Sequence, residues 1–410
     1  MTQFTVHPPK DLSATIHLPA SKSISNRALI INALSGTNAT LGNISDCDDT
    51  RVMLDALRHR PEEINILAAG TAMRFLTAFL SVGKQTHSLT GTERMRHRPI
   101  GVLVDALRNL GAEIAYEAAE GYPPLRITGR KLRGGTLELP GNVSSQYVSA
   151  LLMIGPTMEQ GLRLRLTGKI VSRPYIDMTL SIMRTYGAHA EWQGEDTLHV
   201  APVPYTPVPY VIENDWSAAS YWYQIVALSP APQAGVLLPG LFQASTQGDA
   251  QVQEIFRSLG VETTFTPEGV RLSKRGEPTR HLELNLLRQP DLAQTVVATC
   301  LALGSTFHIT GLQSLRIKET DRIAALKKEF AKLGFLLEDR NDSELLWNGE
   351  RCHPTPDAAL DTYEDHRMAM SLAPCALRLG ALRINNPEVV SKSYPHFWQD
   401  LRQANFRIEG

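Results

Sequence analysis

Little in this sequence points to covalent cross-links, a membrane or a strong electrostatic field. The 410 residues include four cysteines that lie far apart and form no CxxC pair, which argues against a disulfide framework or a zinc site and fits a reducing cytoplasm. The formal net charge of −1 offers no basic field for nucleic acid. There is no run of about 20 apolar residues, and the first ten residues lack the apolar core of a signal peptide, so we expect no membrane span.

The motifs of several common chemistries are missing as well. The sequence has no Walker A motif, no HExxH and no GxGxxG placed after a strand. Chemistry based on ATP, on a peptidase zinc or on a dinucleotide therefore has no support.

The sequence does contain an internal repeat. With 43% hydrophobic residues, the chain is long enough for two domains with sizeable cores. An amphipathic helix that ends in a turn and leads into a strand occurs five times, at intervals of about 70–76 residues. The turn residues are Gly111, Gly187, Gly260, Gly334 and Asn405. A sixth such helix, Val52–Arg58, ends only about 52 residues before Gly111, so we predict that the first repeat lacks a hairpin around His59–Asn65.

A second kind of helix alternates with the first. It starts with polar residues and continues with small and apolar residues on nearly every side, which is typical of a buried helix. Its six copies span Ser21–Gly36, Gly70–Gly83, Ser144–Gly155, Asp215–Ser229, Asp291–Gly304 and Asp365–Gly380. We therefore predict an α/β protein with two pseudo-symmetric domains of three repeats each, in which mixed sheets face outward over buried parallel helices.

The starts of these buried helices suggest an anion site. A helix N-terminus presents unpaired N–H groups and the positive end of the helix dipole. Ser, Thr and Asp at such positions are also ordinary N-caps. Capping does not account for Lys22, Arg74 and Arg367, because the dipole disfavours cations at a helix start. We interpret these cations, together with Arg27 one turn beyond Ser23, as ligands for phosphate or carboxylate groups.

Two further stretches carry charge that could serve the same purpose. We predict that Gly91–Pro99 is a loop whose three arginines bind phosphate, since the planar guanidinium suits oxyanions. We predict that Leu315–Arg322 opens a helix, with Lys318 and Arg322 on one face and Glu319 beside them. An ordinary ion-paired helix start would look the same, so this second stretch is not decisive alone.

These motifs are similar, over essentially the whole chain, to those of the 5-enolpyruvylshikimate-3-phosphate synthase family. The stretches that carry the resemblance are Pro19–Ser23, Gly70–Arg74, Arg94–Pro99, Ser144–Gln146, Ser172–Tyr175, Lys318–Arg322, Asp365–Met370 and Ser391–Lys392. The resemblance implies two domains, each of three βαβαββ units, joined by two crossovers. The first would comprise residues 21–213, and the second residues 1–20 together with 214–410.

The resemblance also implies two substrates and the residues that bind them. Phosphoenolpyruvate would contact Lys22, Gly70, Arg94, Gln146, Arg322, Arg367 and Lys392. Shikimate 3-phosphate would contact Ser23, Arg27, Ser144, Ser145, Gln146, Ser172, Asp291 and Lys318, with Tyr175 lining the same pocket. The chain departs from the family in its short first repeat and at Ala68 and Ser314, where asparagines are common. Because Ser314 replaces an asparagine that contacts shikimate 3-phosphate, we assign no contact to it.

The reaction of this family requires proton transfers, which assign roles to three of these residues. The 5-hydroxyl of shikimate 3-phosphate attacks C2 of phosphoenolpyruvate while C3 gains a proton, and the tetrahedral intermediate then loses phosphate. Asp291 is the candidate base for the hydroxyl, and Lys22 and Glu319 are candidates for moving the C3 proton. We expect no metal, no organic cofactor and no nucleic acid or membrane partner, and we expect a monomer.

Three other functions compete with this one. The related transferase that acts on UDP-N-acetylglucosamine usually has a reactive cysteine in the loop corresponding to Gly91–Pro99, and this loop has none. RNA 3′-phosphate cyclases are built from related repeats but need a nucleotide-binding histidine and a basic RNA face. A non-catalytic anion-binding protein could use the same arginines but would need neither Asp291 nor Glu319.

The herbicide glyphosate competes with phosphoenolpyruvate in the family, and Gly70 argues for sensitivity because glycine leaves the space above it free.

Overall fold

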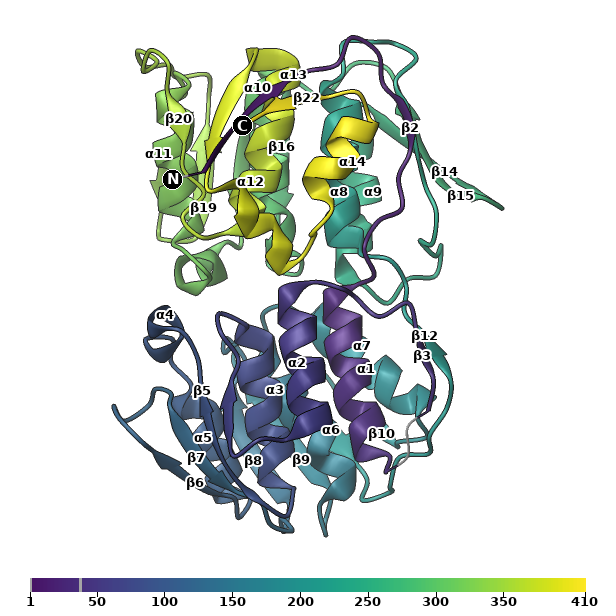
Figure 1. The fold of residues 1–410 in the computed structure, drawn as a ribbon, viewed down its shortest axis with the longest axis vertical. Helices are drawn as coiled ribbons and strands as arrows, with labels where there is room; N and C mark the ends of the chain where they lie inside the picture. Colours follow the sequence, from purple (N-terminus) through teal and green to yellow (C-terminus); the bar gives the residue numbers. More distant parts are fainter. Residues whose placement is uncertain (1, 37–38) are drawn as a thin grey trace. The chain divides into compact units, whose positions relative to one another are not determined.

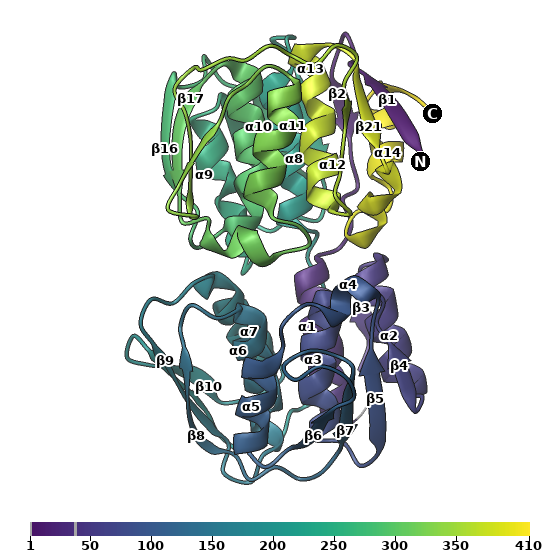
Figure 2. The ribbon, with the colours of Figure 1, turned by 90° about the vertical axis from the view of Figure 1, so that its left-hand side faces the viewer.

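The computed structural model describes residues 2–36 and 39–410, which divide into two compact units (Figures 1 and 2). The N-terminal unit is Ala20–Ile212, and the C-terminal unit is Met1–Pro19 together with Glu213–Gly410. Each unit has a hydrophobic core of its own. The chain therefore passes from one unit to the other twice.

Three helices lie at the centre of each unit and contact one another. They are α1 (Lys22–Leu34), α3 (Gly70–Ser81) and α6 (Ser145–Ile154) in the N-terminal unit, and α8 (Trp216–Leu228), α10 (Ala293–Leu303) and α12 (His366–Leu372) in the C-terminal unit. Short helices extend two of them: η3 (Pro290–Leu292) precedes α10, and η5 (Ala373–Cys375) and α13 (Ala376–Leu379) follow α12. Because these helices are apolar on most sides, nearly all their residues are buried, which confirms the predicted buried helices.

A second set of helices packs outside the central three. They are α2 (Asp48–His59), α5 (Gly101–Asn109) and α7 (Arg173–Thr185), and in the C-terminal unit α9 (Val252–Arg257), α11 (Arg322–Lys332) and α14 (Phe397–Gln403). The predicted turn residue after five of these helices has a positive φ, from 68° at Asn405 to 102° at Gly111. Glycine and asparagine tolerate this left-handed conformation, which stops the helix and turns the chain into the next strand.

The sheets lie on the outside of the helices, as Figure 2 shows most clearly. The C-terminal unit has three four-stranded sheets in the described part of the chain. Their strand orders are β2 (Ser13–Thr15), β13 (Gly235–Leu238), β15 (Gly269–Lys274), β14 (Val261–Thr266); β16 (His281–Asn285), β17 (Thr306–Thr310), β19 (Glu344–Trp347), β18 (Glu338–Arg340); and β20 (Ala359–Leu360), β21 (Leu382–Asn385), β1 (Gln3–His7), β22 (Arg407–Glu409).

The N-terminal unit has two sheets of the same kind and one shorter sheet. The four-stranded orders are β4 (Glu63–Asn65), β5 (Thr86–Thr90), β7 (Leu125–Thr128), β6 (Glu113–Tyr116); and β8 (Gly135–Pro140), β9 (Leu162–Thr167), β11 (Thr197–Val200), β10 (Ala190–Gln193). In all five four-stranded sheets the first pair is parallel and the other two pairs are antiparallel. Strand β9 shows why one face is buried, since its leucines alternate with exposed residues and point to the core. The predicted mixed, outward-facing sheets are confirmed.

The third sheet of the N-terminal unit pairs β3 (Leu41–Gly42) with β12 (Tyr210–Val211) in parallel. It lacks the hairpin that follows the outer helix elsewhere, because α2 ends at His59 and β4 of the next sheet starts at Glu63. The predicted loss of a hairpin around His59–Asn65 is confirmed for the described residues.

The two passages between the units fall between Pro19 and Ala20 and between Ile212 and Glu213. Strand β2 comes before the first passage and pairs with β13, which comes after the second, so both strands belong to the C-terminal unit. Strand β12 comes just before the second passage and pairs with β3 of the same N-terminal unit. The pairing of β2 with β13 therefore joins the N-terminal residues to the C-terminal unit.

Candidate active site

The first turns of the central helices meet at one end of each unit. In the N-terminal unit, Gln146 Nε2 at the start of α6 donates to Thr71 Oγ1 at the start of α3, at 3.1 Å. In the C-terminal unit, Arg367 Nη2 at the start of α12 lies 3.0 Å from Asp291 Oδ2, just before α10. The predicted polar helix starts are thus brought together within each unit, and we describe the two sets in turn.

Helix α1 begins as its sequence predicts. Ser21 is the N-cap and accepts a hydrogen bond from the Ile24 N–H, so Lys22 occupies the first helical position. Lys22 Nζ lies 3.2 Å from Asp49 Oδ2 on α2, and both side chains are largely buried. Asp49 was missed from the sequence because nothing in its local pattern distinguishes it from an acidic residue in a first helical turn.

Arg27 is a buried cation held by neutral groups. Its guanidinium donates to Thr179 Oγ1 at 2.7 Å, and the other acceptors are the Ser23 carbonyl, Ser149 Oγ and the Tyr175 carbonyl. The side chain is only 2% exposed, and burial lowers the pKa of Arg27 to about 10. A buried charge without a countercharge is costly, so this arrangement suits an anionic ligand.

The start of α3 is crowded by arginines. A Cβ on Gly70 would lie 2.6 Å from Arg98 Nη1 and 3.2 Å from Arg74 Nη1, so two guanidinium groups flank this glycine. Arg74 donates to the carbonyls of Gly70 and Pro99, and the Tyr147 hydroxyl also donates to Pro99. These contacts fix the arginine segment against the helix start.

The predicted loop 91–99 is not entirely a loop. Thr92 caps a short helix, α4 (Glu93–Arg96), by accepting from the Met95 N–H. Arg94 therefore lies on a helical turn, where its side chain is exposed. The prediction of a loop failed because a single turn with a Thr cap is too short to produce a periodic pattern.

The remaining predicted residues of the N-terminal unit frame α6 and α7. Ser144 caps α6 and is exposed, while Ser145 and Gln146 in the first turn are partly buried. Ser172 precedes α7 with a left-handed φ of 53° and is 8% exposed, and Tyr175 is partly buried one turn later. The left-handed backbone conformation is uncommon for serine and costs free energy. Such strained residues cluster at functional sites.

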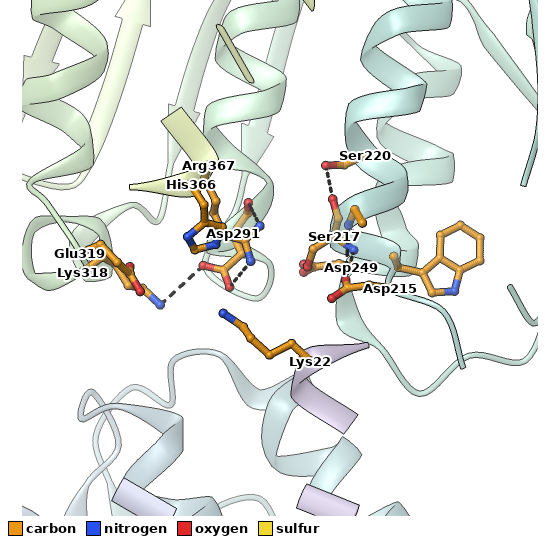
Figure 3. A network of polar contacts seen from close by, with 12 residues as sticks. Lys22, Asp215, Ser217, Ser220, Asp249, Asp291, Lys318, Glu319, His366 and Arg367 are labelled. Atoms are coloured by element: carbon orange, nitrogen blue, oxygen red, sulfur yellow. Dashed lines mark hydrogen bonds and ion pairs between the residues drawn. The ribbon is translucent and has the colours of Figure 1, made fainter. Parts of the chain in front are cut away.

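Asp291 is the centre of the C-terminal set (Figure 3). Its carboxylate lies 3.0 Å from Arg367 Nη2, 3.2 Å from Arg322 Nη1 and 3.6 Å from Lys318 Nζ. Burial alone would raise the pKa of Asp291, but these three cations outweigh it and hold the pKa well below its ordinary value.

Arg322 connects Asp291 to the other carboxylates. It donates to Asp365 Oδ2 at 2.7 Å and to Glu319 Oε2 at 3.0 Å, and its side chain is 2% exposed. Burial opposes the charge of Arg322, but the three carboxylates raise its pKa above the ordinary value. Glu319 also lies 3.4 Å from Lys392 Nζ. All five predicted residues after Asp291 (Lys318, Glu319, Arg322, Arg367 and Lys392) therefore belong to one charged cluster.

The predicted helix from Leu315 to Arg322 is wrong in its boundaries. The structure has a 3-10 helix, η4 (Gln313–Ile317), followed by an extended Lys318, and α11 begins only at Arg322. Asp321 caps the Ala324 N–H and so starts the helix later than predicted. Lys318 and Arg322 do not share a helical face, but both reach Asp291.

Three acidic or titratable residues near this cluster were not predicted as functional. Asp365 is fully buried and accepts a hydrogen bond from the Arg322 guanidinium, although the sequence indicated only an N-cap. His366 is 1% exposed, with Nδ1 3.9 Å from Asp365 Oδ1. Asp249 is 4% exposed and lies beside Ser217 at the start of α8. In the part of the chain that the structure describes, no group of three His, Cys, Asp or Glu side chains could hold a metal ion.

The fold and the charged helix starts define a class of protein, which comparison with solved structures identifies. The structure is similar to an EPSP synthase from Acinetobacter baumannii, with a TM-score of 0.78, 22% sequence identity and full coverage of both chains. It is also similar to the enolpyruvyl transferase NikO from Streptomyces tendae, with a TM-score of 0.71, 17% identity and coverage of 99% and 98%. The chain therefore has the enolpyruvyl transferase fold.

Sequence comparison identifies the family within this class. The model of the family described as EPSP synthase (3-phosphoshikimate 1-carboxyvinyltransferase) matches residues 6–63 and 59–401, and the chain belongs to this family. A relative named 3-phosphoshikimate 1-carboxyvinyltransferase from Bacteroides fragilis (strain YCH46) is 57% identical over 407 residues, covering 99% of each chain. One of the same name from Shewanella pealeana is 36% identical over 432 residues, covering 98% of this chain and 99% of the relative. No helix among the described residues is long and apolar enough to span a membrane.

Proposed function

We propose that this chain transfers the enolpyruvyl group of phosphoenolpyruvate to the 5-hydroxyl of shikimate 3-phosphate, releasing phosphate, as a step in the synthesis of aromatic amino acids. The observation that carries this proposal is the Asp291 carboxylate held among Lys318, Arg322 and Arg367. Simple anion binding has no use for a carboxylate in such a place, whereas a hydroxyl nucleophile needs a base. Membership of the EPSP synthase family supports the same reaction.

In this proposal the two units are the two enolpyruvyl transferase domains, residues 21–213 and residues 1–20 with 214–410. The ligands of phosphoenolpyruvate are Lys22, Gly70, Arg94, Gln146, Arg322, Arg367 and Lys392. Shikimate 3-phosphate takes Ser23, Arg27, Ser144, Ser145, Gln146, Ser172, Tyr175, Asp291 and Lys318. The neutral surroundings of Arg27 support its part, since an incoming phosphate would supply the missing countercharge.

The chemical step then follows from the residues at each atom. Asp291 takes the proton of the 5-hydroxyl as its oxygen bonds to C2, and Lys22 or Glu319 delivers a proton to C3. The arginines stabilise phosphate and carboxylate charge in the tetrahedral intermediate, and loss of phosphate and of a C3 proton restores the enol ether. Asp49 beside Lys22, and Arg322 and Lys392 beside Glu319, would tune these proton donors.

Phosphate release in the presence of both substrates tests the proposal. We expect release with shikimate 3-phosphate as the acceptor, and none with UDP-N-acetylglucosamine, the acceptor of the related transferase. Release with the second acceptor alone, or binding of both substrates without release, would refute it. We further propose that the chain binds no nucleic acid, which its net charge of −1 supports. We also propose that it acts as a monomer, which light scattering would test.

A further inference from the structure

Glu329 on α11 is a fully buried carboxylate that the proposed reaction does not use. It lies about two helical turns after Arg322, the first residue of the helix, so the two side chains are on the same face. From that face Arg322 donates to Asp365 at 2.7 Å. The contacts of Glu329 reach the residues just before Asp365 in the chain.

Glu329 holds residues 361–365, the segment that joins β20 to α12. The Tyr363 hydroxyl donates to Glu329 Oε1, and the Asp361 N–H donates to Glu329 Oε2 at 2.9 Å. Lys332 Nζ lies 2.7 Å from Glu329 Oε2 and donates to Asp361 Oδ2 at 2.9 Å. Burial raises the pKa of Tyr363, and the hydrogen bond to Glu329 raises it further, so the hydroxyl remains a donor at neutral pH.

The backbone of this segment is strained. Tyr363 and Glu364 are consecutive residues with φ of 54° and 56°, in the left-handed region that residues other than glycine adopt only at a cost in free energy. Such a conformation persists only where the surrounding structure holds it. The hydrogen bond between Tyr363 and the buried Glu329 is a restraint of this kind.

The strained residues lie directly before the start of α12, which belongs to the charged cluster. Asp365 caps α12 by accepting from the Arg367 N–H at 2.9 Å, and the Arg367 guanidinium contacts Asp291 Oδ2 at 3.0 Å. Helices α11 and α12 lie side by side (Figure 2). Helix α11 therefore holds both the cap of α12, through Arg322, and the residues that lead into it.

We propose that Glu329 and Tyr363 are positioning residues for the reaction: their hydrogen bond keeps the segment before α12 in its left-handed conformation and so fixes the position of Arg367. The inference rests on the proposed function, in which Arg367 binds phosphoenolpyruvate. An alternative is that the contacts of Glu329 only stabilise the fold. The two roles differ in whether loss of the hydrogen bond changes the affinity for one substrate.

Tyr363→Phe removes the hydroxyl but keeps the aromatic ring, over which Lys328 Nζ lies at 5.6 Å, so the variant should fold. If the hydrogen bond positions Arg367, the KM for phosphoenolpyruvate should rise by about tenfold, because small displacements of binding groups are costly. The KM for shikimate 3-phosphate should change by less than about threefold, since most of its proposed ligands are in the N-terminal unit.

A second change tests whether the hydrogen bond acts through the left-handed backbone. Asparagine adopts this conformation more readily than glutamate, so Glu364→Asn should make the segment less dependent on Tyr363. In the double variant Tyr363→Phe/Glu364→Asn, the KM for phosphoenolpyruvate should return to within about threefold of its value in Glu364→Asn alone. The single variant Glu364→Asn measures the effect of removing the carboxylate.

The experiment measures phosphate release against the concentration of each substrate, together with denaturant unfolding, for the full chain and these variants. Tyr223→Phe is the control, because it removes another tyrosine hydroxyl of the same unit, which lies 2.8 Å from Thr263 Oγ1 on β14. The control should lower stability and leave both KM values unchanged.

A selective rise in the KM for phosphoenolpyruvate in Tyr363→Phe that Glu364→Asn reverses supports the inference. Unchanged kinetics in Tyr363→Phe, with only the free energy of unfolding reduced as in the control, overturn it, and so does a rise that Glu364→Asn leaves in place. A parent chain that releases no phosphate refutes the proposed function itself, whereas an active parent with unaffected variants refutes this inference alone.

Discussion

The two units share one architecture but treat their charges differently. In the C-terminal unit, Arg322 contacts three carboxylates, those of Asp291, Glu319 and Asp365. In the N-terminal unit, Arg27 is buried to the same degree but donates to hydroxyl and carbonyl oxygens. A cation matched by carboxylates positions them for proton transfer, whereas a cation without a countercharge is ready to receive an anion. The comparison therefore predicts that Arg27 receives an anion, whereas Arg322 holds carboxylates in place.

The largest expected effect concerns stability and tests this comparison directly. Arg322→Met leaves three carboxylates buried or nearly buried without their shared partner, which should cost about 3–5 kcal/mol of unfolding free energy. Arg27→Met removes a poorly compensated charge and a few hydrogen bonds, so it should cost about 1 kcal/mol. Denaturant unfolding of both variants without substrates measures the difference. Equal losses would mean that the two arginines are in equivalent surroundings, and the comparison would fail.

The next largest effect concerns turnover. Asp291→Asn keeps the size of the side chain and its capacity for hydrogen bonds but removes the base, so turnover should fall by about 10²-fold or more. Shikimate 3-phosphate should still bind, as titration calorimetry would show. Asp339→Asn is a matched control, because Asp339 pairs with Lys327 and Arg316 outside the cluster. Near-normal turnover in Asp291→Asn would eliminate Asp291 as the base.

The sequence predicted most of the fold because its pattern of apolar residues recurs with each structural repeat. Each buried helix has small and apolar residues on nearly every side, and Gly111 and its counterparts mark the ends of the outer helices. The pairings of β2 with β13 and of β12 with β3 could not be predicted, since β2 and β12 are strands of three and two residues without a pattern of their own. Pairing of such short strands depends on the packed structure and not on local sequence.

The candidate site was predictable where its residues stand in recognisable motifs. Lys22, Asp291, Arg322 and Arg367 were found in this way, and the structure brings the last three together. Asp49 and Asp249 were missed because both look like acidic residues in a first helical turn, where such residues are common. Their positions beside Lys22 and Ser217 depend on contacts across 27 and 32 residues of sequence, which no local pattern reveals.

The smallest expected effect concerns the start of α3, in the same unit as Arg27. The space above Gly70 is not empty, because a Cβ there would lie 2.6 Å from Arg98 Nη1. The contact is with the end of a flexible side chain, so Gly70→Ala should fold and displace Arg98. In the family to which this chain belongs, glyphosate competes with phosphoenolpyruvate and is the longer of the two. We therefore expect glyphosate inhibition to weaken by about tenfold, which corresponds to about 1.4 kcal/mol of binding free energy. The KM for phosphoenolpyruvate should change by less than about threefold.

Two routes could produce this effect, and a double-mutant cycle separates them. The added methyl group could clash with the inhibitor itself, or it could act by moving the Arg98 guanidinium. Arg98→Gln removes the guanidinium without adding a methyl group. If Arg98 mediates the effect, Gly70→Ala should have little further influence on inhibition in the Arg98→Gln background, whereas a direct clash makes the two changes additive. Full glyphosate inhibition of Gly70→Ala would rule out both routes, and with them the account of Gly70 as the residue that keeps this helix start accessible to anions.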